Sequence, residues 1–186
     1  MSVRILVLVG SLRAGSHNRQ IAETAVKIAP SGVEVELFDG LGEVPFYNED
    51  VDVEGRVPAP AVRLREEVTR ADALLLCTPE YNGTMPAVLK NAIDWVSRPY
   101  GAGVIVGKPV AVVGTASGRY GGVWAQDEAR KALGIAGGRV LEDVRLAVPG
   151  SVTRFADIHP VADDEVVAGL SEVIQRLHAQ VTAEAA

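Results

Sequence analysis

Short apolar runs alternate with amphipathic segments along the chain. The runs at residues 3–9, 73–78 and 110–114 are almost wholly apolar, whereas residues 33–38 alternate Val or Leu with Glu. Continuous apolar runs are typical of strands buried on both faces of a parallel sheet, and alternation is typical of an edge strand. A fifth strand is predicted over residues 139–148, with Val140, Leu141, Val144, Leu146 and Val148 as its apolar set.

Between these strands, apolar residues return at helical spacing. The pattern predicts helices over residues 18–29, 60–71, 87–97 and 123–133, and a last helix from Asp163-Asp164 towards Val181. In the second helix, Val62, Leu64 and Val68 are the predicted inward positions. We expect residues 182–186 to fray. Five strands alternating with helices predict one α/β domain over residues 1–186, a doubly wound parallel sheet between two helix layers.

Three polar, glycine-containing loops each follow a predicted strand. They span residues 10–18, 79–86 and 115–122. Ligands of doubly wound sheets bind outside the carboxyl ends of the strands, at the point where the strand order reverses. Because these ends share one edge of the sheet, the three loops are expected to form a single site.

The first loop has the composition of an anion site. A strand–loop–helix unit directs backbone N–H groups and the positive end of a helix dipole at one spot. Ser11, Ser16 and Asn18 add neutral donors, and Arg13 adds a charge-assisted one. The alternative is that these are turn and N-cap residues without a ligand.

The loop lacks two known phosphate-binding motifs, and this restricts the kind of anion that it could bind. Ser16-His17 stands where a Walker A loop requires Lys-Ser/Thr, and Leu12 interrupts the G-x-G-x-x-G dinucleotide fingerprint. A nucleoside triphosphate and a pyrophosphate are therefore disfavoured. A terminal monophosphate fits best.

Bulk properties restrict the class of protein further. The net charge is −6, which disfavours binding to nucleic acid or to an anionic membrane. The single cysteine, Cys77, excludes an internal disulfide and is expected in the core. With only three histidines, the sequence shows no Cys/His pattern typical of a metal site. His159 and His178 are expected at the surface. Without a signal peptide or a membrane-length apolar run, a soluble cytoplasmic protein is expected.

The second loop offers groups that suit a flat heteroaromatic ring. Tyr81 supplies an aromatic side chain, Asn82 an amide, and the turn several N–H groups. The competing interpretation is that Tyr81 covers the core and Asn82-Gly83 is only a turn dipeptide.

Together, GSLRAGSHNR, PEYNGTMPAVLKNAIDW and GTASGRYGG resemble the NADPH-dependent FMN reductase family, which includes azo-, quinone- and chromate-reducing members. The resemblance extends from Val3 to about Leu146. It implies a flavodoxin-like fold with strand order 2-1-3-4-5, bound FMN, NADPH or NADH as electron donor, and a homodimer or homotetramer, with the segment from Pro86 to Trp95 near the subunit interface.

The resemblance also assigns cofactor-binding residues. The first loop matches the family's FMN phosphate loop, the second its loop against the isoalloxazine ring, and the third its loop beside the ribityl chain. The residues implied are Ser11, Arg13, Ser16 and Asn18; Pro79, Glu80, Tyr81, Asn82 and Gly83; and Ser117 and Gly118.

The chemistry implied is hydride transfer from NAD(P)H to the flavin and then to a quinone-like or other flat small-molecule acceptor. No catalytic side chain is needed, because the flavin carries the redox step. A non-enzymatic electron carrier and a flavin-binding scaffold stay open as alternatives. A hydrolase is disfavoured, because Thr115 and Arg119 replace the glycines of a G-x-S-x-G elbow around Ser117.

Overall fold

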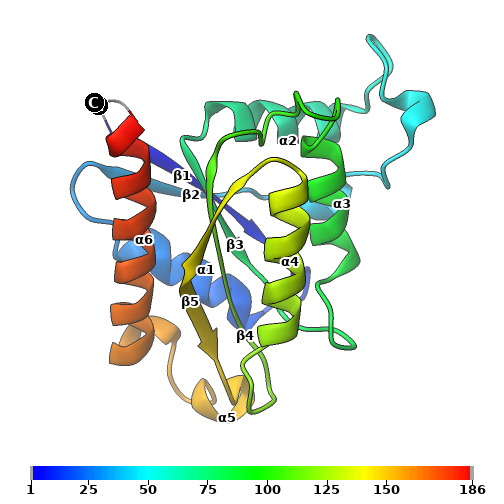
Figure 1. Cartoon of the computed structure of the whole chain (residues 1–186). Helices are drawn as coiled ribbons and strands as arrows, with labels where there is room; N and C mark the ends of the chain where they lie inside the picture. Colours follow the sequence, from blue (N-terminus) through cyan, green and yellow to red (C-terminus); the bar gives the residue numbers. More distant parts are fainter. Residues whose placement is uncertain (1, 185–186) are drawn as a thin grey trace.

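The computed structural model describes residues 2–184 and contains one five-stranded parallel sheet (Figure 1). The strand order is β2-β1-β3-β4-β5, so the predicted fold class is confirmed, with the alternating strand at an edge. The strands are β1 (Val3–Val9), β2 (Val33–Leu37), β3 (Ala73–Cys77), β4 (Pro109–Thr115) and β5 (Arg139–Val148).

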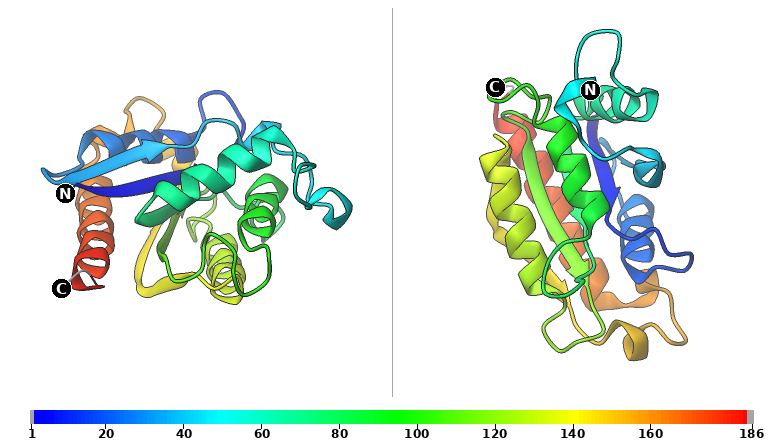
Figure 2. Two further views of the ribbon diagram at one scale, coloured as in Figure 1. Left: turned by 90° about the horizontal axis from the view of Figure 1, so that it is seen from above. Right: turned by 90° about the vertical axis from the view of Figure 1, so that its right-hand side faces the viewer.

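Helices cover both faces of this sheet (Figure 2). Helices α1 and α6 pack on one face, and α2, α3 and α4 pack on the other. The helices are α1 (His17–Lys27), α2 (Ala59–Arg70), α3 (Ala87–Val96), α4 (Val123–Ile135), the short α5 (Ser151–Arg154) and α6 (Asp164–Glu184). Single 3₁₀ turns lie at Leu41–Glu43, Glu49–Val51 and Pro160–Ala162.

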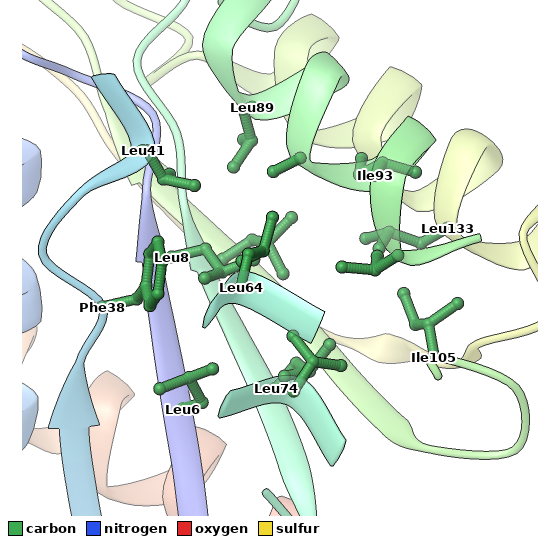
Figure 3. Close-up of a cluster of buried hydrophobic side chains, with 14 of the residues drawn as sticks. Leu6, Leu8, Phe38, Leu41, Leu64, Leu74, Leu89, Ile93, Ile105 and Leu133 are labelled. Carbon is green, nitrogen blue, oxygen red and sulfur yellow. The ribbon is translucent and has the colours of Figure 1, made fainter. Parts of the chain in front are cut away.

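The alternation of side chains along β1 divides the core into two halves. Ile5 and Val7 face α1 and α6, whereas Leu6 and Leu8 face the other helix layer. Figure 3 shows this second half, in which Leu64, Leu89, Ile93 and Leu133 converge on β1 and β3 from three helices. Burial of each such side chain stabilises the fold by about 1.5–3 kcal/mol. The sheet is therefore held rigidly on both faces, and its strand ends are fixed platforms for the loops.

One predicted inward position in α2 is wrong. Val62 is 38% exposed, and Ala61 takes its place beside Leu64 and Val68 in the core. At 100° per residue, Val62 lies about 200° from Leu64 around the helix, so the two cannot share a face. The buried stripe of α2 consists of Ala61, Leu64 and Val68.

The burial predicted for single residues can be compared with the structure. Cys77 is buried as predicted, and this burial raises the pKa of its thiol to about 12. Trp95 is fully buried, and its Nε1–H donates to the Pro45 carbonyl at 2.7 Å. His159 and His178 are partly exposed, in keeping with the predicted surface positions. The imidazole Nδ1 of His159 accepts the Val161 N–H at 3.2 Å and so caps the 3₁₀ turn before α6.

The last helix extends into the segment that we expected to fray. Helix α6 continues to Glu184, and residues 185 and 186 of the segment expected to fray lie outside the described residues. None of the helices within residues 2–184 is long and apolar enough to cross a membrane.

Candidate functional site

The first loop joins β1 to the N-terminus of α1. Ser16 is the N-cap, and its Oγ accepts the Arg19 N–H at 3.3 Å. Within residues 2–184, no hydrogen bond occupies the backbone N–H groups of His17 and Asn18, and the first turn of α1 contains no acidic residue. Free N–H groups at a helix N-terminus without a neighbouring carboxylate form an anion site.

Arg13 lies beside this helix end with its guanidinium available. Its side chain is exposed, and within residues 2–184 its guanidinium makes one long hydrogen bond, 3.4 Å from Nη1 to the Ala14 carbonyl. Its N–H donates weakly, at 3.4 Å, to the hydroxyl of the partly exposed Ser11. A guanidinium that has no carboxylate partner in the described chain can form a bidentate bond to a phosphate.

The side chain of Asn18 connects the first loop to the third. Its amide donates to the Thr115 carbonyl at 2.9 Å, and its Oδ1 accepts the Thr115 N–H at 3.0 Å. Both polar ends of this buried side chain are therefore used within the protein. The backbone N–H of Asn18 is the group that remains for a ligand, while the side chain fixes the spacing between two loops.

The second loop forms a tight turn at the end of β3. Tyr81 and Thr84 exchange backbone hydrogen bonds of 3.0 and 3.1 Å, and the residues between them, Asn82 and Gly83, have φ values of 53° and 77°. Positive φ at both central positions is the geometry of a type I′ turn, for which Asn-Gly is a preferred pair. Tyr81 is exposed, so it does not cover the core.

Glu80 extends from this loop to α4. Its Oε2 accepts the backbone N–H groups of Trp124 and Ala125 at 3.1 and 3.2 Å. The carboxylate therefore caps the N-terminus of a helix that begins 43 residues beyond it. The N-cap of α4 is Gly122, which has no side chain, and within residues 2–184 no other side chain caps this helix.

The third loop is held by the segment that follows β5. The Thr115 hydroxyl donates to the Val148 carbonyl at 2.7 Å, and the N–H groups of Gly150 and Ser151 donate to the carbonyls of Gly118 and Ala116 at 3.3 and 3.0 Å. These contacts leave Ser117 and Gly118 exposed at the strand ends. Sequence reasoning missed this segment and α5, although Pro149-Gly150 is a recognisable turn pair.

The strand ends come close enough to unite the three loops. A Cβ added to Gly114 would lie 2.1 Å from the Thr78 carbonyl oxygen and 3.4 Å from Oδ1 of Asn18. Only glycine permits this approach, which brings the second loop, the third loop and α1 together. The predicted convergence on one edge is thus observed.

Aromatic side chains border this edge on its α4 side. The rings of Tyr120 and Trp124 are 5.9 Å apart between centroids, and Trp124 is 57% exposed. The guanidinium of Arg119 lies 4.5 Å from the centre of the Tyr120 ring. Trp124 also approaches Gly83, since a Cβ on that glycine would be 3.8 Å from its ring. Trp124 was not identified from the sequence.

His17 is the titratable group nearest the anion site. Its ring packs edge-on against Phe155 with 5.5 Å between centroids. Burial, and secondarily the positive charge of Arg13, lower the pKa of His17 from its usual value. The imidazole is therefore neutral at pH 7.

Two surface pockets were compared with the position of this site, and one of them adjoins it. One of about 320 Å³ lies between the first loop and residues 38–42 and includes Ser11 and Arg13. Another of about 450 Å³ lies between α3 and α4, away from the strand ends. A parallel sheet of order 2-1-3-4-5 with three polar loops at the switch point defines a flavodoxin-like fold.

Comparisons with known proteins identify the family. Residues 3–153 match the NADPH-dependent FMN reductase family. The chain is 44% identical over 130 residues to a 2-hydroxy-1,4-benzoquinone reductase of a Burkholderia species, covering 70% of this chain and 69% of that protein. It is 41% identical over 165 residues to an NAD(P)H-dependent FMN reductase of Pseudomonas aeruginosa, covering 89% and 77%.

A solved structure agrees with this. The flavoenzyme NAD(P)H:(acceptor) oxidoreductase FerB of Paracoccus denitrificans superposes with a TM-score of 0.85 at 31% identity, covering 97% of this chain and 98% of that one. The chain therefore belongs to the NADPH-dependent FMN reductase family. It is an oxidoreductase with FMN as its flavin cofactor and NAD(P)H as its electron donor.

The residues at the carboxyl ends of the strands suit FMN. The free N–H groups of α1 and the unpaired guanidinium of Arg13 suit its monophosphate, and the exposed loops beyond them leave room for the ring. The other predicted contacts, Pro79, Glu80, Tyr81, Asn82, Gly83, Ser117 and Gly118, lie on the second and third loops as expected.

Proposed function

We propose that the protein passes hydride from NAD(P)H to FMN and then to a quinone-like or other flat acceptor, in two successive half-reactions at one site. The observation that carries the proposal is the convergence of three loops beside an α1 N-terminus that no carboxylate occupies. When bound, FMN supplies a ring that takes hydride from NAD(P)H and passes it to the acceptor, which also takes a proton from solvent. The protein binds and orients; no side chain has to move a proton.

Each loop has a separate task in this proposal. Ser11, Arg13, Ser16 and the N–H groups at the start of α1 bind the phosphate. The loop from Pro79 to Gly83 supports one side of the ring, and Ser117 and Gly118 adjoin the ribityl chain. An open edge bordered by Tyr81, Tyr120 and Trp124 admits donor and acceptor in turn, since exposed aromatic rings stack on flat molecules.

A quinone-like acceptor is supported by the names of the relatives. The Burkholderia protein is a 2-hydroxy-1,4-benzoquinone reductase, and a relative from Pseudomonas putida, 44% identical over 129 residues, is a quinone reductase. Alternating use of one open site predicts ping-pong kinetics. Double-reciprocal plots at several NAD(P)H concentrations should be parallel with a benzoquinone as acceptor, and intersecting lines would contradict the ping-pong order.

The first test is an absorption spectrum of the purified protein with FMN, before and after anaerobic NADPH, followed by a benzoquinone. We expect a bound-flavin spectrum that bleaches with NADPH or NADH and returns with the quinone. Flavin that binds but stays oxidised with both nucleotides would favour the electron carrier or scaffold. Absence of FMN binding would overturn the proposal.

We also propose a homodimer, or a homotetramer built from it, in the cytoplasm, where NAD(P)H is available. The pocket between α3 and α4 supports an interface there, because it is lined by apolar residues such as Ile93 and Ala132 and bordered by the exposed Tyr100 and Ile135. Sedimentation should give at least a dimer at micromolar concentration, and Ile135→Glu should weaken it. An active wild-type monomer would refute this assembly.

A further inference from the structure

Glu80 is a member of the ring-side loop whose side chain has its own partners in the fold. Its Oε2 binds the N–H groups of Trp124 and Ala125, the first-turn groups of α4. The N-cap residue Gly122 has φ of 81° and contributes no side chain, so this helix depends on a residue from another loop for its cap. A carboxylate at a helix N-terminus satisfies both its N–H groups and its dipole.

We propose that Glu80 is a positioning residue of the flavin site, with two consequences. Its carboxylate fixes the second loop against the start of α4, and its charge fills the anion site that α4 would otherwise offer. This inference rests on the proposed function for the location of the flavin ring. The contacts of Glu80 themselves do not depend on it.

The positioning consequence follows from where the two hydrogen bonds act. They join the base of the Asn82-Gly83 turn to the helix that carries Trp124, and the Thr84 hydroxyl joins the far end of the same turn to Glu128 on α4. Without the Glu80 carboxylate, the outer connection and the Trp124–Gly83 contact remain, but the two hydrogen bonds at the base of the turn are lost. The slot between the second and third loops would then widen on the side nearest the strand ends.

The electrostatic consequence follows from the charge. The N-termini of α1 and α4 both adjoin the same edge of the sheet. With Glu80 in place, α1 presents free N–H groups and an uncompensated dipole, whereas the start of α4 is occupied by a carboxylate. The phosphate is thereby directed to α1, and the ring-side loops stay free of a competing anion.

The test compares Glu80→Ala and Glu80→Gln with Glu128→Gln as the matched control. Glu128 also joins the second loop to α4, but it does not bind the helix N-terminus. The glutamine at position 80 retains a carbonyl that can accept the two N–H groups, so it separates loss of charge from loss of the hydrogen bonds. Each variant is measured for FMN and riboflavin binding by fluorescence, and as apoprotein for thermal stabilisation by inorganic phosphate.

Glu80→Ala should weaken FMN and riboflavin equally, by about tenfold for the loss of a charged hydrogen-bond acceptor. Its apoprotein should be stabilised by phosphate more strongly than the wild type, because the N-terminus of α4 has become free. Glu80→Gln should restore most of the riboflavin affinity. Glu128→Gln should behave as wild type in both assays.

A Glu80→Ala variant that matches Glu128→Gln in either assay would overturn the inference. If the wild type bound no flavin at all, the proposed function would fail, yet the phosphate response of the apoproteins would still report on Glu80. An unfolded Glu80→Ala protein leaves Glu80→Gln as the decisive variant. Its phosphate response must then exceed that of Glu128→Gln, and an equal response would refute the role of the charge.

Discussion

The N-termini of α1 and α4 are two versions of the same local structure. Each follows a buried strand and a glycine-containing loop, and each reaches the edge of the sheet where the predicted site lies. In α1 the cap is the neutral hydroxyl of Ser16, and two N–H groups stay free. In α4 the carboxylate of Glu80 accepts the N–H groups of Trp124 and Ala125, the second and third residues of the helix.

A strand–loop–helix unit is therefore not by itself a phosphate site. What matters is whether the chain already supplies a negative charge to the helix end. In the proposed function the two units therefore have opposite tasks: α1 offers an anion site, and α4 holds the two ring-side loops together.

The largest expected effect comes from Asn18, which joins the α1 side of this comparison to the third loop. Asn18→Ala removes both hydrogen bonds to Thr115 and leaves a buried N–H and a buried carbonyl without partners. We expect the free energy of unfolding in urea to fall by about 2–4 kcal/mol, with weaker FMN binding.

Asn91→Ala is the matched control for that variant. Asn91 is 5% exposed and Asn18 is 4% exposed, and Asn91 likewise bonds backbone groups, the Tyr47 N–H at 2.8 Å and the Pro45 carbonyl at 3.0 Å. It should destabilise the fold similarly while FMN affinity stays normal. Equal loss of FMN affinity in both variants would show that Asn18 acts through stability alone.

The next effect concerns the charge at α1. Arg13→Ala should weaken FMN binding by about 1.5–3 kcal/mol, the contribution of a hydrogen bond to a charged group. The unfolding free energy should change little, because Arg13 is exposed and has no carboxylate partner within the described residues. Unchanged FMN affinity, measured by fluorescence titration, would remove Arg13 from the phosphate site.

The comparison also explains which parts of the site could be predicted. The apolar runs of β1 and β3 identify buried strands because every apolar position there is buried beneath a helix layer. Loop convergence follows from parallel strands alone. The partners of Asn18 and Glu80 could not be found this way, since Thr115 is 97 residues from Asn18 and the N–H of Trp124 is 44 residues from Glu80.

Other features were missed because tertiary contacts decide them. The short α5 forms where the chain after β5 bonds to the third loop, a contact with no local pattern. The buried Arg130 donates to the carbonyls of Val112 and Val144 at 2.6 and 3.3 Å, where the pairing of β4 and β5 changes register. A charged residue in a helix pattern gives no sign of such burial.

The smallest expected effect concerns His17 at the first position of α1. Its pKa is lower in the folded than in the unfolded protein, so the unfolded protein binds more protons near pH 6. This group should therefore lower the stability as the pH decreases from about 7 to about 5, through the unfolded pKa of about 6.5. His17→Gln should lack that part of the decrease, measured by urea unfolding at both pH values. An identical decrease in the variant and the wild type would contradict this origin.

In the proposed function, the uncharged N-terminus of α1 binds the phosphate of FMN. The most direct test is the ratio of the riboflavin and FMN dissociation constants, measured in the wild type and in Ser16→Asp, which retains an N-cap oxygen but gives α1 the charge that α4 has. We predict that the wild type binds FMN at least about tenfold more tightly than riboflavin. In Ser16→Asp the two ligands should bind almost equally, with riboflavin affinity and stability retained. A variant that keeps the full preference for FMN would contradict the account.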